Sequence, residues 1–210
     1  MRGCFLCYAA PVGSHVNARG DRPMTFGSFN ALQKISTGSL LLWKAVLDAV
    51  PGSRLAIKTI ALRDTELQKV FLGRISAAGI AADRVSILDP APNVQSHLDQ
   101  YNQIDVALDT VPYNGTTTTC EALAMGVPVI TLRGDRHASR VSTSLLTAAG
   151  FSEWIAESPE QFVAIARSLA TDPSELTLLR SRIPAQMAAS SLCNGRDFAE
   201  RFLETVREMW

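Results

Sequence analysis

The stretch DVALDTVPYNGTTTTCEALAMGVPVITL, residues 105–132, is the one that determines the predicted fold of this 210-residue chain. It holds two short apolar runs rich in β-branched residues, DVALD and VPVITL, with a helix-forming segment between them. Two such runs joined through a helix are typical of a β-α-β unit, whose strands lie parallel in one sheet. The stretch therefore predicts an α/β protein.

The same alternation continues on both sides of this unit. Further strands are predicted at residues 24–30, 54–60, 84–89 and 153–156. Helices are predicted from Ser36 or Thr37 to Val50, and at residues 64–79, 94–103, 138–149, 159–171, 173–189 and 196–209. Since helical crossovers cover both faces of a parallel sheet, the pattern predicts a doubly wound sheet. Residues 1–23 are expected to be a terminal segment and linker, 24–190 the domain, and 191–210 a final helix packing back on it.

Composition excludes several classes of protein. Basic and acidic residues number 20 each, so the net charge is near zero, which argues against a general nucleic-acid binder and a polybasic membrane surface. Apolar residues make up 47% of the chain, enough for a core, but no apolar run has the length of a membrane span. The first residues make a poor signal peptide. We expect a cytoplasmic protein.

The four cysteines predict no metal or redox centre. Cys4 and Cys7 form a CxxC pair, whereas Cys120 and Cys193 stand alone in the sequence. A structural zinc site needs about four ligands, and His15 adds little support for one. Packing of a terminal segment is the simpler interpretation of the pair.

Polar segments follow four of the predicted strands. They are residues 31–34, 90–97, 110–119 and 133–140. Ligands of doubly wound sheets bind at the carboxyl ends of the strands, so we expect these segments to face one crevice.

The run of threonines in this crevice has two interpretations. Thr118 and Glu121 fit the S/T-x-x-E capping box, which needs no ligand. That box leaves Thr116 and Thr117 unexplained. A helix start after a strand also offers free amides and partial positive charge to a phosphate, and threonine hydroxyls can add donors. No P-loop or dinucleotide fingerprint is present in the sequence.

Three other polar residues are candidates. Lys34 follows the first strand and can neutralise a diphosphate, although it also fits an ordinary exposed lysine. His97, early in the helix after the third strand, can be a surface residue or stack on a base. Arg140 lies where a helix start disfavours positive charge, so either a negative partner or chance surface placement accounts for it.

Several separated segments together resemble one known family. They are TFGSFNALQKIS (25–36), LDTVPYNGTTTTCEALAMGVPVITLRGDRHASRV (108–141), SLLTAAG (144–150) and SSLCNGRDFAERFLETVREMW (190–210). In this order they resemble the carboxyl-terminal half of the catalytic region of the O-GlcNAc transferase and SPINDLY family, over about residues 5–210. The resemblance implies a GT-B glycosyltransferase, built from two Rossmann-like domains, of which the second binds the nucleotide-sugar donor.

The resemblance also implies roles for individual positions. Lys34 matches the lysine that contacts the donor diphosphate, and Thr116, Thr117 and Thr118 match the segment that binds its phosphates. His97 matches the histidine that stacks on the base, and Glu121 matches an acidic residue that holds the ribose hydroxyls. Pro92 matches a turn residue whose backbone lies beside the base.

The chain also departs from the pattern of many O-GlcNAc transferases. Those have His-Thr-Thr at positions 116–118 and Asp at position 121, and the animal enzyme has basic residues where Val94 and Gln100 stand here. The TTTTCE form looks more like the SPINDLY branch, whose plant member uses GDP-fucose. UDP-GlcNAc is the favoured donor and GDP-fucose the alternative.

The expected activity is transfer of a single sugar to Ser or Thr hydroxyls of proteins. Lys34 and the helix start would stabilise the leaving diphosphate; no DxD motif is present, so no metal cofactor is expected. The family's upstream catalytic domain and tetratricopeptide repeats do not occur in these residues, and residues 1–10 resemble the end of that upstream domain. The chain alone is therefore expected to be incomplete and inactive, or a non-catalytic nucleotide-sugar-binding module.

Overall fold

The core of the molecule is a six-stranded parallel sheet of order β3-β2-β1-β4-β5-β6. The computed structural model describes residues 3–9, 16–17 and 20–210. The strands are β1 (Thr25–Ser28), β2 (Arg54–Ile57), β3 (Val85–Ile87), β4 (Val106–Leu108), β5 (Val129–Leu132) and β6 (Ile155–Ala156). Every pairing between neighbouring strands is parallel, which confirms the doubly wound α/β prediction.

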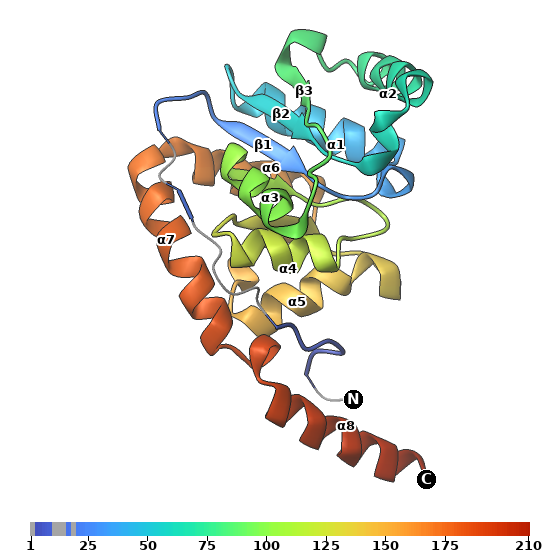
Figure 1. The fold of residues 1–210 in the computed structure, drawn as a ribbon, viewed down its shortest axis with the longest axis vertical. Helices are drawn as coiled ribbons and strands as arrows, with labels where there is room; N and C mark the ends of the chain where they lie inside the picture. The colour runs from blue at the N-terminus through green and yellow to red at the C-terminus, as the bar shows by residue number, and fades with distance from the viewer. Residues whose placement is uncertain (1–2, 10–15, 18–19) are drawn as a thin grey trace.

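Helices cover both faces of this sheet (Figure 1). The helices are α1 (Thr37–Ala49), α2 (Thr65–Ala77), α3 (Val94–Asp99), α4 (Thr117–Ala124), α5 (Val141–Ala149), α6 (Pro159–Thr171), α7 (Pro173–Ala189) and α8 (Gly195–Met209). Two predicted helices are shorter than expected: the 94–103 helix gives way to a 3-10 turn at Gln100, and the 138–149 helix begins at Val141.

Strand alternation divides the core into two halves. Leu55 and Ile57 of β2 pack with α1, α2 and α6, while Ala56 between them packs in the half formed by α3, α4, α5 and α7. Successive side chains of a strand point to opposite faces, so a strand buried on both faces is apolar throughout. The sheet is therefore the middle layer of three.

Side-chain caps set the starts of several helices. Ser36 accepts a hydrogen bond from the Ser39 amide and begins α1, and Asp64 accepts from two amides of α2. Asp172 does the same for α7, where proline at the first helical position adds a second start signal. The caps at Ser36 and Asp64 agree with the starts predicted for these two helices.

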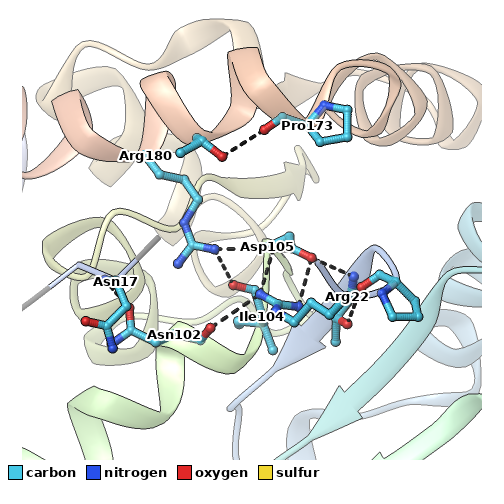
Figure 2. Close-up of polar contacts among 10 residues, drawn as sticks. Asn17, Arg22, Asn102, Ile104, Asp105, Pro173 and Arg180 are labelled. Carbon is cyan, nitrogen blue, oxygen red and sulfur yellow. Dashed lines mark hydrogen bonds and ion pairs between the residues drawn. The ribbon is translucent and has the colours of Figure 1, made fainter. Parts of the chain in front are cut away.

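An ion-pair cluster ties together the amino ends of the central strands (Figure 2). Asp105, fully buried just before β4, contacts Arg22 through both carboxylate oxygens, at 2.7 and 3.0 Å. It also accepts from the Thr25 amide of β1 at 2.8 Å. Arg180 of α7 reaches the same carboxylate at 3.4 Å and the Ile104 carbonyl at 2.8 Å. This cluster lies at the edge of the sheet opposite the carboxyl ends of its strands.

The last helix does not pack on the sheet. α8 continues beyond the end of α7 and away from the sheet (Figure 1), and none of its side chains is buried. Residues 191–210 contact the rest of the fold through Leu192, which is fully buried, and through Arg201, whose guanidinium lies 3.5 Å from the Cys4 carbonyl. The charged and apolar faces of residues 195–209 both lie at the surface.

No helix among the described residues combines the length and the apolar character needed to cross a membrane.

Candidate functional site

A cavity of about 590 Å³ opens at the carboxyl ends of the strands. The order of the sheet reverses between β1 and β4, and such a switch point is where doubly wound sheets bind ligands. Phe29 and Ala31 after β1 line the cavity, opposite Thr118 and Glu121 of α4. Residues 58–60 after β2, His97 on α3 and four residues around the start of α3 form the rest of the wall; these four are Pro90, Ala91, Asn93 and Val94. The volume is within the range of small-molecule sites.

His97 lies half-buried in this wall and is held from both ring nitrogens. Its Nε2 is 2.9 Å from Oε2 of Glu121, and its Nδ1 forms a short hydrogen bond with Nζ of Lys58. The ring also meets Tyr101 edge-on, with 5.7 Å between centroids. The imidazole is therefore fixed in one orientation beside the cavity.

Glu121 accepts a second hydrogen bond on the same oxygen, from the Tyr101 hydroxyl at 3.0 Å. Tyr101 is fully buried, and burial raises its pKa well above the ordinary value, with the nearby Glu121 charge adding to the effect. The phenol therefore stays protonated and remains a donor to Glu121.

Lys58 is a site residue that the sequence analysis missed. Its side chain is only 7% exposed, and its Nζ also lies 5.2 Å from the centre of the Phe29 ring. Burial lowers the pKa of Lys58, and the charge of Glu121 partly opposes this shift. Its position in the sequence could have pointed to it. Lys58 directly follows the apolar run of β2, at the edge of the sheet where the ligand was expected.

The capping-box prediction for Thr118 and Glu121 is wrong. α4 begins at Thr117 with Thr116 at the N-cap position, two residues earlier than a capping box at Thr118 requires. Thr118 Oγ1 donates to Asn30 Oδ1 at 2.9 Å, and Glu121 is engaged by His97 and Tyr101. Both side chains therefore make tertiary contacts instead of closing the helix start.

The amino end of α4 is not capped by a side chain. The first amides of an α-helix have no acceptor within the helix, and the dipole places partial positive charge there. Thr116 is half-buried and Thr117 is exposed at this end. The start of α4 thus offers free donors next to the cavity wall at Thr118.

The loop that leads into α4 is held by Asp109, which the sequence analysis did not single out. Its Oδ1 accepts from the amides of Thr110 (2.8 Å) and Gly115 (2.7 Å), and its Oδ2 accepts from the Thr131 hydroxyl (2.7 Å). Asp109 is fully buried, and burial raises its pKa while these hydrogen bonds oppose the shift.

Lys34 approaches the same loop from the β1 side. Its Nζ donates to the Asn114 carbonyl at 2.9 Å and lies 4.0 Å from the centre of the Tyr113 ring. Burial lowers the pKa of Lys34, and the negative charge of Asp109 partly opposes this. A half-buried cation thus lies beside the residues that precede the start of α4.

Comparison with known proteins identifies the family. The model of glycosyl transferase family 41 matches residues 16–202. The chain belongs to glycosyltransferase family 41.

Named relatives agree with this assignment. Over 99% of its length the chain is 39% identical to a protein of Arabidopsis thaliana named probable UDP-N-acetylglucosamine–peptide N-acetylglucosaminyltransferase SPINDLY. Over 90% it is 30% identical to the UDP-N-acetylglucosamine–peptide N-acetylglucosaminyltransferase of Caenorhabditis elegans. It spans less than a quarter of each relative, 23% and 16% respectively.

A solved structure of the same kind is also similar. A mutant O-GlcNAc transferase of Thermobaculum terrenum superposes with a TM-score of 0.81 at 36% identity, covering 92% of this chain and 38% of that one. More distant glycosyltransferases, such as Anabaena HepE at a TM-score of 0.57 and 14% identity, share the fold. The family 41 chain is thus one Rossmann-like domain of the GT-B type.

The remaining predicted positions of the family 41 chain lie at the rim of the cavity or beside it. Pro92 is exposed in the turn between Ala91 and Asn93, both of which line the cavity. Val94 is 70% exposed at the rim. Gln100 points its Nε2 to the Asp89 carbonyl instead, at 2.8 Å.

The segment after β5 does not line the cavity as predicted. It borders the loop before α4, where the Asn114 amide donates to the Ala138 carbonyl at 2.9 Å. Arg140 at its end is exposed and occupies the N-cap position of α5.

Three of the four cysteines of the family 41 chain lie in or against the core. Cys4 and Cys120 are buried in one core half, and Cys193 packs against it. Cys120 has its pKa raised to about 12, mainly by burial. Within residues 3–9, 16–17 and 20–210, no group of three or more His, Cys, Asp or Glu side chains is arranged to hold a metal; His15 lies outside these residues.

Proposed function

We propose that this chain is the donor-binding domain of a protein O-glycosyltransferase that transfers one sugar to Ser or Thr hydroxyls. UDP-GlcNAc is the favoured donor, in keeping with the names of the plant and nematode relatives. The observation that carries the proposal is one cavity that brings His97, Thr118 and Glu121 together beside the uncapped start of α4.

The proposal assigns each part of the donor to one part of the site. The base stacks on the imidazole of His97, next to the turn that contains Pro92. The ribose hydroxyls donate to Glu121, whose Oε1 has no hydrogen bond to any described residue, while its Oε2 is occupied by Tyr101 and His97. The diphosphate lies at the amino end of α4, against Thr116, Thr117 and Thr118, within reach of Lys34.

In the proposed reaction the acceptor hydroxyl attacks the anomeric carbon of the sugar. A new carbon–oxygen bond forms as the bond to the diphosphate oxygen breaks, so negative charge develops on the leaving group. Lys34 and the first-turn amides of α4, rather than a metal ion, stabilise that charge. A base must accept the proton of the hydroxyl. Since the relatives are more than four times longer, we assign that base to an upstream domain of the same protein.

Calorimetric titration of the folded chain with UDP, GDP, UDP-GlcNAc and GDP-fucose tests the proposal. We expect UDP-GlcNAc to bind with higher affinity than either guanosine compound. If GDP-fucose binds more tightly, GDP-fucose becomes the proposed donor in place of UDP-GlcNAc, and the proposed transferase function stands. Absence of binding by all four would contradict a donor site in this cavity.

The same titration repeated with a chelator tests the metal-independent part of the proposal. We expect affinity to stay unchanged when EDTA is added, because the proposed contacts to the diphosphate come from Lys34 and amides. A second assay tests the incompleteness of the chain: the isolated domain should transfer no sugar to a Ser/Thr peptide. A cytoplasmic location belongs to the same proposal.

A further inference from the structure

Lys58 is the buried cation nearest to His97, and its surroundings are unusual for a lysine. Its side chain is 7% exposed, and within the described parts of the chain no carboxylate lies in salt-bridge range of its Nζ. Burying a charged group without a paired opposite charge is unfavourable. A role beyond packing would account for an ammonium group at this place.

The contact between Lys58 and His97 determines where the imidazole carries its proton. The charged ammonium of a lysine can only donate, so beside it Nδ1 of His97 accepts. A proton on Nδ1 would place two donors against each other. The neutral ring therefore carries its hydrogen on Nε2, which points at Glu121 Oε2 over 2.9 Å.

The same contacts also determine which carboxylate oxygen of Glu121 accepts hydrogen bonds from the protein. Its Oε2 accepts from Nε2 of His97 and from the Tyr101 hydroxyl, which is itself buried and fixed. Lys58, His97 and Tyr101 come from three separate segments, after β2, on α3 and in the 3-10 turn that follows. Together they hold the imidazole and the carboxylate in one relative position at the cavity wall.

We propose that Lys58 is a positioning residue for the donor site, which acts through His97 by holding its ring in the Nε2–H tautomer with one face toward the cavity. This inference rests on the proposed donor-binding function and adds a determinant of affinity to it. Lys58 itself does not contact the donor in this proposal. A purely structural role would instead leave the tautomer and the donor affinity unchanged when the ammonium is removed.

The first test uses nitrogen NMR of the native chain at pH about 8, between the ordinary pKa values of histidine and lysine. The chain has three histidines, so the His97 signal is identified by its loss in His97→Ala. We expect the Nε2–H tautomer in the native protein. An Nδ1–H ring in the native chain would overturn the proposal without any need for a Lys58 variant.

The variant arm uses Lys58→Met, which keeps the aliphatic stem against Phe29 and removes the donor. We expect the share of the Nδ1–H tautomer of His97 to rise above its native level, because only Glu121 then favours the Nε2–H form. The control is Lys69→Met, an exposed lysine that pairs with Glu66 on the same helix α2, and it should keep the native tautomer. A pure Nε2–H ring in folded Lys58→Met would show that the lysine does not set the tautomer, and would overturn the proposal.

A double-mutant cycle on nucleotide affinity tests whether Lys58 acts through His97. Lys58→Met alone should weaken binding of the preferred nucleoside diphosphate roughly ten-fold, the scale of one lost hydrogen bond. In the His97→Ala background the same substitution should change affinity less than about two-fold. An equal loss in both backgrounds would place Lys58 on the nucleotide itself and contradict the proposal. If the native chain binds no nucleotide, the donor-site proposal fails, and the tautomer measurement still decides the role of Lys58.

Discussion

Lys34 and Lys58 both lie near the switch point of the sheet, one half-buried and the other buried. Of the two, Lys34 lies nearer the loop before α4, the position that suits contact with a diphosphate. Its ammonium lies 2.9 Å from the Asn114 carbonyl, a neutral acceptor, so the positive charge has no carboxylate bonded to it in the described residues. Because the ammonium is partly shielded from water at this position, burial lowers the pKa of Lys34.

Replacing Lys34 with alanine should weaken nucleoside diphosphate binding by about 1–3 kcal/mol, the scale of a hydrogen bond to a charged group. Binding needs the ammonium form, and the pKa of Lys34 is lowered. Affinity of the native chain should therefore fall as pH rises, beginning at a lower pH than for an exposed lysine. Calorimetry across a pH series measures both effects. Lys69→Ala is the control, and equal affinity of Lys34→Ala and native chain would contradict the role.

Asp109 shows how one buried carboxylate can organise a loop. Three donors, the amides of Thr110 and Gly115 and the hydroxyl of Thr131, converge on its two oxygens. Asp109→Ala leaves all three buried without that acceptor and should lower the free energy of unfolding by about 2–5 kcal/mol. Asp109→Asn keeps an acceptor for both amides and should cost less than half as much. Urea denaturation measures the two; equal losses would show that the amide contacts contribute little.

At the scale of one element, Thr117 and Thr118 of α4 differ in burial and in hydrogen bonding. Thr118 connects the helix to the loop after β1 through Asn30, which is 5% exposed. Thr117 is exposed and makes no side-chain hydrogen bond among the described residues. Neighbouring threonines of α4 thus differ in their contacts with the rest of the fold.

The pair Thr117→Val and Thr118→Val tests whether the two residues have different tasks. Thr117→Val should leave stability within about 0.5 kcal/mol of native, as for most surface substitutions, and weaken diphosphate binding by about 1–3 kcal/mol. Thr118→Val should lower stability by about 1 kcal/mol, because Asn30 loses a donor. Thermal unfolding and calorimetry on both variants provide the measurements. Loss of stability in Thr117→Val as large as in Thr118→Val would refute the division of tasks.

At the scale of the whole molecule, the Asp105 cluster joins segments that are distant in the sequence (Figure 2). Arg22 precedes β1, Asp105 precedes β4 and Arg180 lies on α7, and all three meet at the amino edge of the sheet. The cluster lies opposite the cavity, so it supports the frame that holds the site without contacting the site.

Asp105→Ala should lower the free energy of unfolding by about 3–5 kcal/mol, because it leaves the buried guanidinium of Arg180 without its carboxylate. Glu157→Ala is the matched control: it breaks a 2.8 Å pair with Arg133 in which both side chains are more than a third exposed. That change should cost no more than about 1 kcal/mol. Chemical denaturation compares the two, and similar losses would show that burial does not decide the contribution of these ion pairs.

The sequence by itself determined the type and order of the elements. All six strands and the long helices are legible from it, because buried parallel strands are continuous apolar runs and helix caps such as Ser36 and Asp64 act within a few residues. It also determined the edge of the sheet where a ligand would bind, since that edge follows from parallel topology alone. Lys34, His97 and the threonine run were chosen as candidates by that rule.

Only the tertiary structure decided which side chains meet. Thr118 and Glu121 match a local capping pattern, yet each finds a partner from another segment, Asn30 and His97. Lys58 and Asp109 were missed for the same reason: a charged residue at the end of an apolar run looks like the end of a strand. Contacts between residues far apart in sequence depend on how strands are ordered and how helices pack on them. That order, β2-β1-β4 at the switch point, is what places Lys58 against His97 and leaves the start of α4 open to a ligand.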